Sequence, residues 1–178
     1  MSDRRGPGHI PSVTFLCTGN AARSVIAGAA LSQHLPSAVI ATAGTFVVEG
    51  QPMSVRTRAA LASVGLAAPE HRSRQAVEDE LRGADVIVGL AQEHVEWVRR
   101  ELPSLAARTG TLRRLCRDLR AGPESLADRV ADLHLDLIDL EDWEEVVDPG
   151  GGETPEFERC ARDIVALVPV LAAALAAP

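Results

Sequence analysis

The stretch VTFLCTGNAARSVIAG, residues 13–28, combines a cysteine, a loop of small residues and an arginine–serine pair in an order that could bind an anion. Five residues separate Cys17 from Arg23. A loop of this length that leads into a helix can curl until its backbone N–H groups converge, which makes a site for a tetrahedral dianion. Gly19 and Asn20 tolerate the left-handed backbone that such curling requires. Arg23 adds a planar fork for two of the anion's oxygens.

The thiol of Cys17 gives this loop a second capacity, which is nucleophilic attack. Helix N-termini and neighbouring cations favour the thiolate over the thiol. The Ser24 hydroxyl can donate to the sulfur and ease its departure. A cysteine that ends a buried strand is often only a small core residue. A strand, a cysteine, a short loop, Arg-Ser and a helix in succession are much rarer, so the pattern favours nucleophilic catalysis on a bound oxyanion.

The composition is that of a globular protein with no nucleic-acid partner. The 178 residues suit one domain with a sizeable core, and 46% of them are hydrophobic. The net charge is −7, and no basic stripe with interleaved aromatic residues is present. The three cysteines are far apart, without a CxxC pair, an HExxH motif or a Cys/His cluster. We therefore expect no metal site, no cofactor, no disulfide framework and a cytoplasmic location.

Short β-branched and apolar runs alternate with segments of helical pattern, which predicts a parallel sheet with right-handed crossovers. In such open sheets, ligands bind outside the carboxyl ends of the strands. Cys17 lies at the carboxyl end of the first strand and is therefore well placed for a site. We predict strands over residues 13–17, 38–43, 84–90 and 109–116, and helices over 23–35, 54–65, 74–82 and 91–102.

Three further segments are described by their composition alone. Residues 1–11 carry charges without an apolar h-region and are predicted to be a disordered leader, which leaves 12–178 as a single domain. Residues 164–178 are apolar but shorter than the roughly 20 residues of a membrane span, so we expect a terminal helix that covers the sheet. The acidic stretch 132–147 is expected to be solvated, with a protein-contact surface as the alternative.

Four motifs, in the same order, are similar to those of the low-molecular-weight protein tyrosine phosphatase family. VTFLCTGNAARS resembles its N-terminal phosphate loop, and TAGT at 42–45 resembles the end of its second strand. HRSRQ at 71–75 resembles its His-x-x-Arg-Gln element, and VVDPGGG at 146–152 its late Asp-Pro loop. The resemblance implies an α/β fold of three layers, with a four-stranded parallel sheet flanked by helices. This fold agrees with the alternation of strands and helices.

The resemblance also implies roles for individual residues. Cys17 would be the nucleophile, Arg23 the phosphate clamp, and Asp148 the general acid that protonates the leaving oxygen. Phosphate and other oxyanions would bind the loop. The implied reaction is hydrolysis of a phosphoprotein, with phosphotyrosine favoured, through a phosphocysteine intermediate. The remaining implied contacts are Thr18, Gly19, Asn20, Ala21, Ala22, Ser24 and Phe46 for the substrate, and Thr42 and His71 as residues that hold Asn20.

Three departures from the family pattern concern the substrate more than the chemistry. Ala22 stands where the family often has a second cysteine, so no protective disulfide can form within the loop. Gly150, Gly151 and Gly152 follow Asp-Pro where tyrosine-specific members carry aromatic residues. Phe46 is then the best candidate for an aromatic face. Leu90-Ala91 replaces the family's Met-Asp, which removes a carboxylate that normally braces the site.

Three other functions stay open. Related bacterial phosphoarginine phosphatases often have Gly-Gly after Asp-Pro. Their specificity depends on threonine in place of isoleucine at one position of the phosphate loop, and Ala21, which occupies that position here, is neither. Arsenate reductases of related fold have a similar loop, although the thioredoxin-coupled type needs two further thiols after the third strand, where this chain has none. Cys116 is expected to end the fourth strand and Cys160 to lie in the last helix, so reduction would need a small-molecule thiol. A non-catalytic phosphoresidue-binding module would not need both Cys17 and Asp148.

Overall fold

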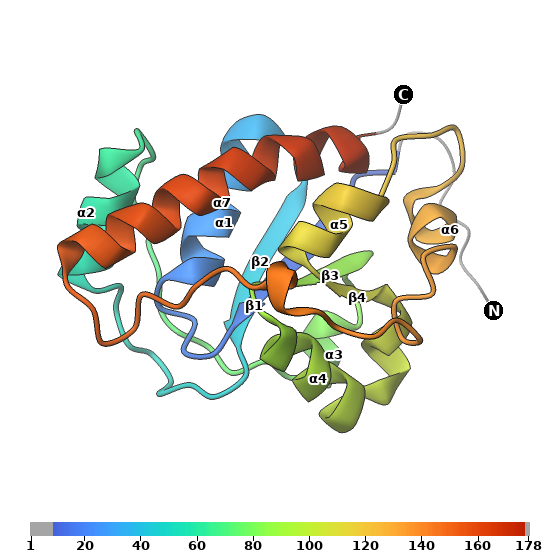
Figure 1. Cartoon of the computed structure of the whole chain (residues 1–178), viewed down its shortest axis with the longest axis horizontal. Helices are drawn as coiled ribbons and strands as arrows, with labels where there is room; N and C mark the ends of the chain where they lie inside the picture. The colour runs from blue at the N-terminus through green and yellow to red at the C-terminus, as the bar shows by residue number, and fades with distance from the viewer. Residues whose placement is uncertain (1–8, 177–178) are drawn as a thin grey trace.

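The structure, a computed structural model, describes residues 9–176, in which strands and helices alternate (Figure 1). The four strands are β1 (Ser12–Cys17), β2 (Val39–Gly44), β3 (Val86–Gly89) and β4 (Thr109–Thr111). The α-helices are α1 (Arg23–His34), α2 (Val55–Ser63), α3 (Glu78–Leu81), α4 (Gln92–Glu101), α5 (Leu112–Asp118), α6 (Leu126–Ala131) and α7 (Thr154–Leu175). Two 3₁₀ helices, η1 (Pro103–Arg108) and η2 (Asp142–Glu144), complete the set.

The strands form one sheet in the order β2-β1-β3-β4, and every neighbouring pair is parallel. The chain leaves β1 towards one edge of the sheet to form β2 and returns to the other side of β1 to form β3. The carboxyl end of β1 is therefore the point at which the strand order reverses, where ligands of open α/β sheets bind. Cys17, which pairs with Gly44 in the register of β1 and β2, lies at this point.

Helices cover both faces of the sheet, which confirms the predicted three-layer α/β fold. On one face, Val13 and Phe15 of β1 pack in a core cluster with α1, α2, α5 and α7, which includes Ile26 and Ile164. On the other face, Leu16 packs with residues of α3, α4 and η1. The alternation of side chains along β1 thus supplies both cores. Figure 1 shows the long helix α7 running across the first face, beside α1 and α5.

Two elements differ from their predicted extents. The fourth strand ends at Thr111, whose hydroxyl caps α5 by accepting a hydrogen bond from the Arg114 N–H at 3.1 Å, so Cys116 lies in a helix and not in a strand. The helix predicted over 74–82 is confined to Glu78–Leu81. The residues before Glu78 are not helical, because they pair with the end of β2: the Gly44 N–H donates to the Arg74 carbonyl at 2.9 Å.

The two ends of the chain differ in how they attach. Residues 1–8 of the expected leader lie outside the described residues. Within residues 9–11, His9 Nε2 lies 2.7 Å from Asp85 Oδ2, and the Pro11 carbonyl accepts from the Val39 N–H at 2.8 Å. The last helix packs on α1, α2 and α5. Within residues 9–176, no helix is both long enough and apolar enough to cross a membrane.

The acidic segment 132–147 is anchored to the fold at several points, one of which is a buried carboxylate. Glu144 is fully buried; one of its oxygens accepts a hydrogen bond from Arg114 and the other accepts from the Thr111 hydroxyl at 2.6 Å. The guanidinium of Arg114 also lies over the Trp143 ring, 5.1 Å from its centroid. This anchor fixes the chain a few residues before Asp148, so at its end the segment is structural rather than merely solvated.

The Glu144 anchor makes stability depend on pH. Burial alone would raise the pKa of the Glu144 carboxyl, but hydrogen bonds from Arg114, Thr111 and the Glu141 N–H bring the pKa below its usual 4.5. A carboxyl with a lowered folded-state pKa adds stability above its unfolded-state pKa, and this stability is lost as the pH falls through the folded-state value. We expect Glu144→Gln to lower the free energy of unfolding at neutral pH by about 2–4 kcal/mol.

Urea denaturation of wild type and Glu144→Gln across a pH series checks this expectation. The difference between the two proteins should shrink as the pH falls from 4.5, the usual glutamate value, through the lower folded-state pKa of Glu144. Over that range the unfolded wild-type chain binds a proton at Glu144 before the folded protein does, which favours unfolding. A difference that stays constant into acid would mean that the charge of Glu144 is not what stabilises the anchor.

Candidate active site

The loop between β1 and α1 places Cys17 next to Ser24. Cys17 is buried at the end of β1, and its Sγ lies 3.1 Å from the Ser24 Oγ in the first turn of α1. Asn20 Nδ2 donates to the same Ser24 oxygen at 3.0 Å. Because that donation occupies a lone pair, the hydroxyl proton of Ser24 is left for the sulfur. The arrangement can therefore stabilise negative charge on Cys17.

Asn20 holds the loop in its curled form. Its φ is 48°, in the left-handed region that asparagine tolerates better than most residues, and it is fully buried. Its carbonyl accepts from His71 Nε2 at 2.6 Å and from the Ser73 hydroxyl at 3.0 Å. Its side-chain Oδ1 accepts from the Arg74 N–H at 3.0 Å. The segment 71–74 thus braces Asn20 from outside the loop.

The structure brings His71 to Asn20 as expected but not Thr42. Among the described residues, Thr42 makes no hydrogen bond to Asn20, and its methyl group faces α1, 2.9 Å from where a Cβ on Gly28 would lie. The alternation of side chains along β2 turns Thr42 toward the helix and away from the loop. Ser73 supplies the hydroxyl instead. Only its place within HRSRQ, two residues after His71, could have indicated this role.

A matched pair of substitutions tests which hydroxyl braces the loop. Ser73→Ala removes one of two side-chain donors to the Asn20 carbonyl, so we expect the free energy of unfolding to fall by about 1–2 kcal/mol. Thr42→Val keeps the methyl contact with α1 and should change it by less than about 0.5 kcal/mol. Chemical denaturation measures both. Equal losses from the two variants would contradict the assignment of Ser73.

The end of β2 is tied directly to the loop. The Thr45 N–H donates to the Cys17 carbonyl and the Phe46 N–H to the Thr18 carbonyl, each at 3.0 Å. At Gly44, a Cβ would lie 2.5 Å from the Thr18 carbonyl oxygen, so only glycine allows this approach. The Phe46 side chain is 82% exposed. Its backbone holds the loop, and its ring is free at the surface.

Arg23 and Asp148 meet although they are far apart in the sequence. Arg23 is buried at the start of α1, and its Nη2 donates to Asp148 Oδ2 at 2.8 Å. Its Nη1 donates to the Val146 carbonyl at 3.3 Å. The Val146 N–H in turn donates to the Leu90 carbonyl, just beyond β3, at 2.9 Å. A backbone attachment to the sheet therefore carries the Asp148 segment to the loop.

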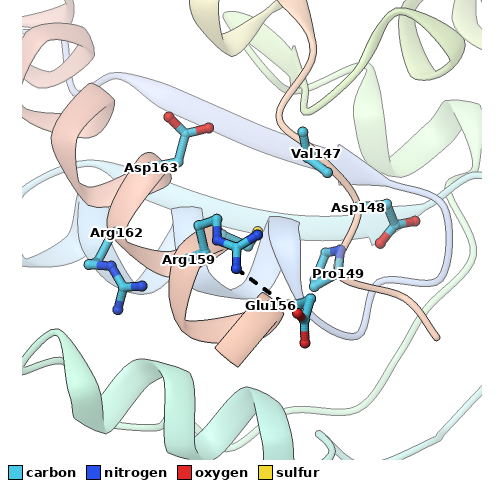
Figure 2. Close-up of a pocket in the computed structure, with 8 residues that line it drawn as sticks. Val147, Asp148, Pro149, Glu156, Arg159, Arg162 and Asp163 are labelled. Carbon is cyan, nitrogen blue, oxygen red and sulfur yellow. Dashed lines mark ion pairs between the residues drawn. The ribbon is translucent and has the colours of Figure 1, made fainter. Parts of the chain in front are cut away.

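A short turn orients the Asp148 carboxylate. While Oδ2 accepts from Arg23, Oδ1 accepts from the Gly150 N–H at 2.9 Å. Figure 2 shows the other side of this segment, where Val147 and Pro149 face Arg159 and Asp163 of α7 across a crevice of about 460 Å³. Asp148 lines both this crevice and a second cavity, which opens over the loop.

A cavity of about 290 Å³ opens over the loop and is wide enough for a small anion with an attached group. Several of the residues that line it, among them Thr57 and Phe157, lie outside the four sequence motifs. Thr57 of α2 donates from its hydroxyl to the Ala21 carbonyl at 2.9 Å, and Phe157 of α7 is the aromatic residue of the lining. The sequence indicates only that each of the two residues lies in a segment of helical pattern. The lining consists of Cys17, Gly19, Ala21, Ala22, Arg23, Ser54, Thr57, Asp148, Gly150 and Phe157.

The other two cysteines are poorly placed for thiolate chemistry. Burial raises the pKa of Cys116 to about 11 and that of Cys160 to about 12. The Cys116 thiol donates to the Leu167 carbonyl at 3.3 Å, and Cys160 is buried in α7. All three cysteines of the chain are free thiols. Neither Cys116 nor Cys160 is a thiolate near neutral pH, which disfavours a thiol relay through them.

Comparison with known proteins finds phosphatases among the relatives of this chain. The chain is 31% identical over 102 residues to the protein-arginine-phosphatase of Geobacillus stearothermophilus, covering 57% of this chain and 68% of that relative. It is 29% identical over 106 residues to the probable low molecular weight protein-tyrosine-phosphatase EpsP of Ralstonia solanacearum, covering 60% and 71%.

Solved structures share the fold. The tyrosine phosphatase Wzb from Escherichia coli K30 in complex with sulphate superposes with a TM-score of 0.76 at 20% identity, covering 94% of this chain and 100% of that one. The YwlE arginine phosphatase from Geobacillus stearothermophilus gives 0.71 at 24% identity, covering 91% and 90%. The family model described as low molecular weight phosphotyrosine protein phosphatase matches residues 12–178. This chain therefore belongs to that family of phosphatases.

Proposed function

We propose that this chain is a cysteine-dependent phosphomonoesterase that hydrolyses phosphotyrosine in proteins, without a metal or cofactor, in the cytoplasm. One observation carries the proposal: the sulfur of Cys17, the Arg23 guanidinium and the Asp148 carboxylate line one cavity at the carboxyl end of β1. These are a nucleophile, an anion clamp and an acid, which are the three groups that transfer of a phosphoryl group to sulfur requires. The three free cysteines are compatible with a reducing compartment.

The first step is in-line attack of the Cys17 thiolate on phosphorus, which forms an S–P bond and breaks the bond to the leaving oxygen. Arg23 and the N–H groups of Thr18 to Ala22 stabilise the phosphoryl oxygens in the transition state. Asp148, protonated for this step, gives its proton to the leaving oxygen. The product alcohol or phenol departs neutral, and the carboxylate of Asp148 remains.

The second step returns the enzyme to its starting state. A water attacks the phosphocysteine while the Asp148 carboxylate takes a proton from it. The S–P bond breaks, inorganic phosphate forms, and the electron pair returns to the sulfur. The Ser24 hydroxyl, 3.1 Å from Sγ, donates to the departing thiolate. Asn20, with His71 and Ser73, keeps the loop curled throughout.

The shape of the cavity favours an aryl phosphate. Ala21, Ala22 and Phe157 present apolar surface above the buried sulfur. A phosphotyrosine ring is long enough to span from a deep thiolate to the protein surface, whereas a phosphoserine side chain is short. Phosphoarginine is the second candidate. The relative of 31% identity named protein-arginine-phosphatase and the glycines after Asp148-Pro149 favour it.

Hydrolysis of matched phosphopeptides in the presence of EDTA tests the proposal. We expect the highest kcat/KM for the phosphotyrosine peptide and no measurable turnover of the phosphoserine peptide. A preference for the phosphoarginine peptide would establish the second candidate. Arsenate should only compete with the substrate. Arsenate reduction with an added small-molecule thiol, or phosphate binding with no hydrolysis at all, would each replace the proposal by a reductase or by a binding module.

A further inference from the structure

The start of helix α4 lies against the phosphate loop and places a buried histidine there. His94 is fully buried, and its Nδ1 accepts from the Ala91 N–H at 3.0 Å, which caps the helix. Its Nε2 lies 3.1 Å from the Thr18 Oγ1 and 3.2 Å from Glu93 Oε1. Thr18 directly follows Cys17. None of the motifs in the sequence marks His94 or Glu93.

The hydrogen bonds fix where the proton of His94 resides. Because Nδ1 accepts from a backbone N–H, the neutral ring carries its proton on Nε2. Burial, together with the nearby charge of Arg23, lowers the pKa of His94 to about 3. The ring is therefore neutral near neutral pH. Its Nε2–H is a permanent donor toward the Thr18 hydroxyl.

The Thr18 hydroxyl connects this donor to Arg23. Its proton goes to Glu93 Oε1 at 2.9 Å, and its oxygen accepts from His94 and from Arg23 Nη2, the latter at 3.2 Å. With one proton donated and two lone pairs occupied, the hydroxyl can take only this orientation. The oxygen then presents a fixed acceptor to the guanidinium.

We propose that His94 is a positioning residue for the phosphate clamp: through Thr18, it fixes the orientation in which Arg23 meets the phosphoryl oxygens. The role rests on the proposed function of the same site. Glu93 completes the arrangement, since its Oε1 also lies 3.8 Å from Arg23 Nη2. Glu93 stands two residues beyond Ala91. Its carboxylate takes the place of the aspartate carboxylate that the family's Met-Asp supplies and that Leu90-Ala91 lacks.

Three substitutions at residue 94 separate the hydrogen bond to Thr18 from the helix cap at Ala91. His94→Gln can keep both, because a glutamine three residues into a helix can accept from the capping N–H while its amide donates at the position of Nε2. His94→Asn keeps the acceptor for Ala91 but is too short to donate to Thr18. His94→Leu keeps the bulk and removes both. Thermal unfolding of each variant reports the loss of the cap separately.

We expect kcat/KM for p-nitrophenyl phosphate to fall by about 10–100-fold in His94→Asn and His94→Leu, because a misplaced clamp weakens transition-state contacts. His94→Gln should stay within about threefold of wild type. Activity in His94→Asn equal to that of wild type would overturn the proposal, because the cap alone would then explain the histidine. Should the residue 94 variants fail to fold, Thr18→Val against Thr18→Ser tests the same connection, since only serine keeps the hydroxyl.

Calorimetric titration with inorganic phosphate provides a readout that does not require turnover. In a Cys17→Ser background, His94→Asn should weaken phosphate binding by about tenfold, and His94→Gln should not. Equal affinities would overturn the role of His94 even if the enzyme were active. If phosphate affinity depends on residue 94 in this way but the wild-type protein hydrolyses nothing, the proposed function is refuted. The role of His94 in orienting Arg23 then still stands.

Discussion

Cys17→Ser is expected to lower kcat for p-nitrophenyl phosphate by at least about 10⁴-fold, the largest effect of any substitution in this chain. A serine hydroxyl at this position is a much weaker nucleophile than a thiolate, and no other side chain of the cavity can replace the sulfur. Arg23 and the loop N–H groups are unchanged by the substitution. Inorganic phosphate should therefore bind within a few-fold of its wild-type affinity.

Steady-state kinetics and phosphate titration measure the two quantities. Cys160→Ser is the matched control, because it exchanges the same atoms at a buried thiol that lies outside the cavity over the loop. That control should keep activity within about threefold of wild type. Substantial activity of Cys17→Ser would contradict the thiolate of Cys17 as the required nucleophile. A simultaneous loss of phosphate binding would mean that the substitution had damaged the loop.

The second large effect is expected for Asp148→Asn, which removes the proton donor and keeps the volume. Rates should fall by about 10²–10⁴-fold. The loss should be greatest for alkyl and phenyl phosphates, whose leaving oxygens need a proton, and smallest for aryl phosphates with strongly acidic phenols. The geometry places the carboxylate beside the clamp, because Arg23 donates to its Oδ2 at 2.8 Å and the Gly150 N–H donates to its Oδ1 at 2.9 Å.

A plot of log kcat/KM against the pKa of the leaving phenol checks the assignment. The slope should be steeper in Asp148→Asn than in wild type. Asp142→Asn changes an exposed acid of the same segment and should leave both rate and slope unchanged. Equal slowing across the leaving groups in Asp148→Asn would remove Asp148 as the general acid and leave it a partner of Arg23 alone.

The parts of the fold that depend on local patterns could be predicted from the sequence. The central strands β1 and β3 are short apolar runs, and the parallel order follows from the alternation with helices. The loop from Cys17 to Arg23 could also be recognised locally, because glycine and asparagine before a helix tolerate its curl, although the segment 71–74 holds it in place. These features require little knowledge of distant contacts.

Most of the features that escaped prediction depend on contacts between distant segments. TGTLRRLC favours a fourth, more polar edge strand, but the Thr111 hydroxyl caps a helix and links it to Glu144. Ser73 replaces Thr42 beside Asn20 because of how two segments align at the end of β2. The role of His94 requires knowing that α4 begins against Thr18.

The most direct measurement of the central claim is the stereochemical course at phosphorus. The wild-type protein transfers the phosphoryl group of an isotopically chiral aryl phosphate to an added alcohol, and the configuration at phosphorus in the product ester is determined. Two in-line displacements, first by Cys17 and then by the acceptor, predict overall retention. Inversion would show a single displacement without a phosphocysteine and would contradict the account.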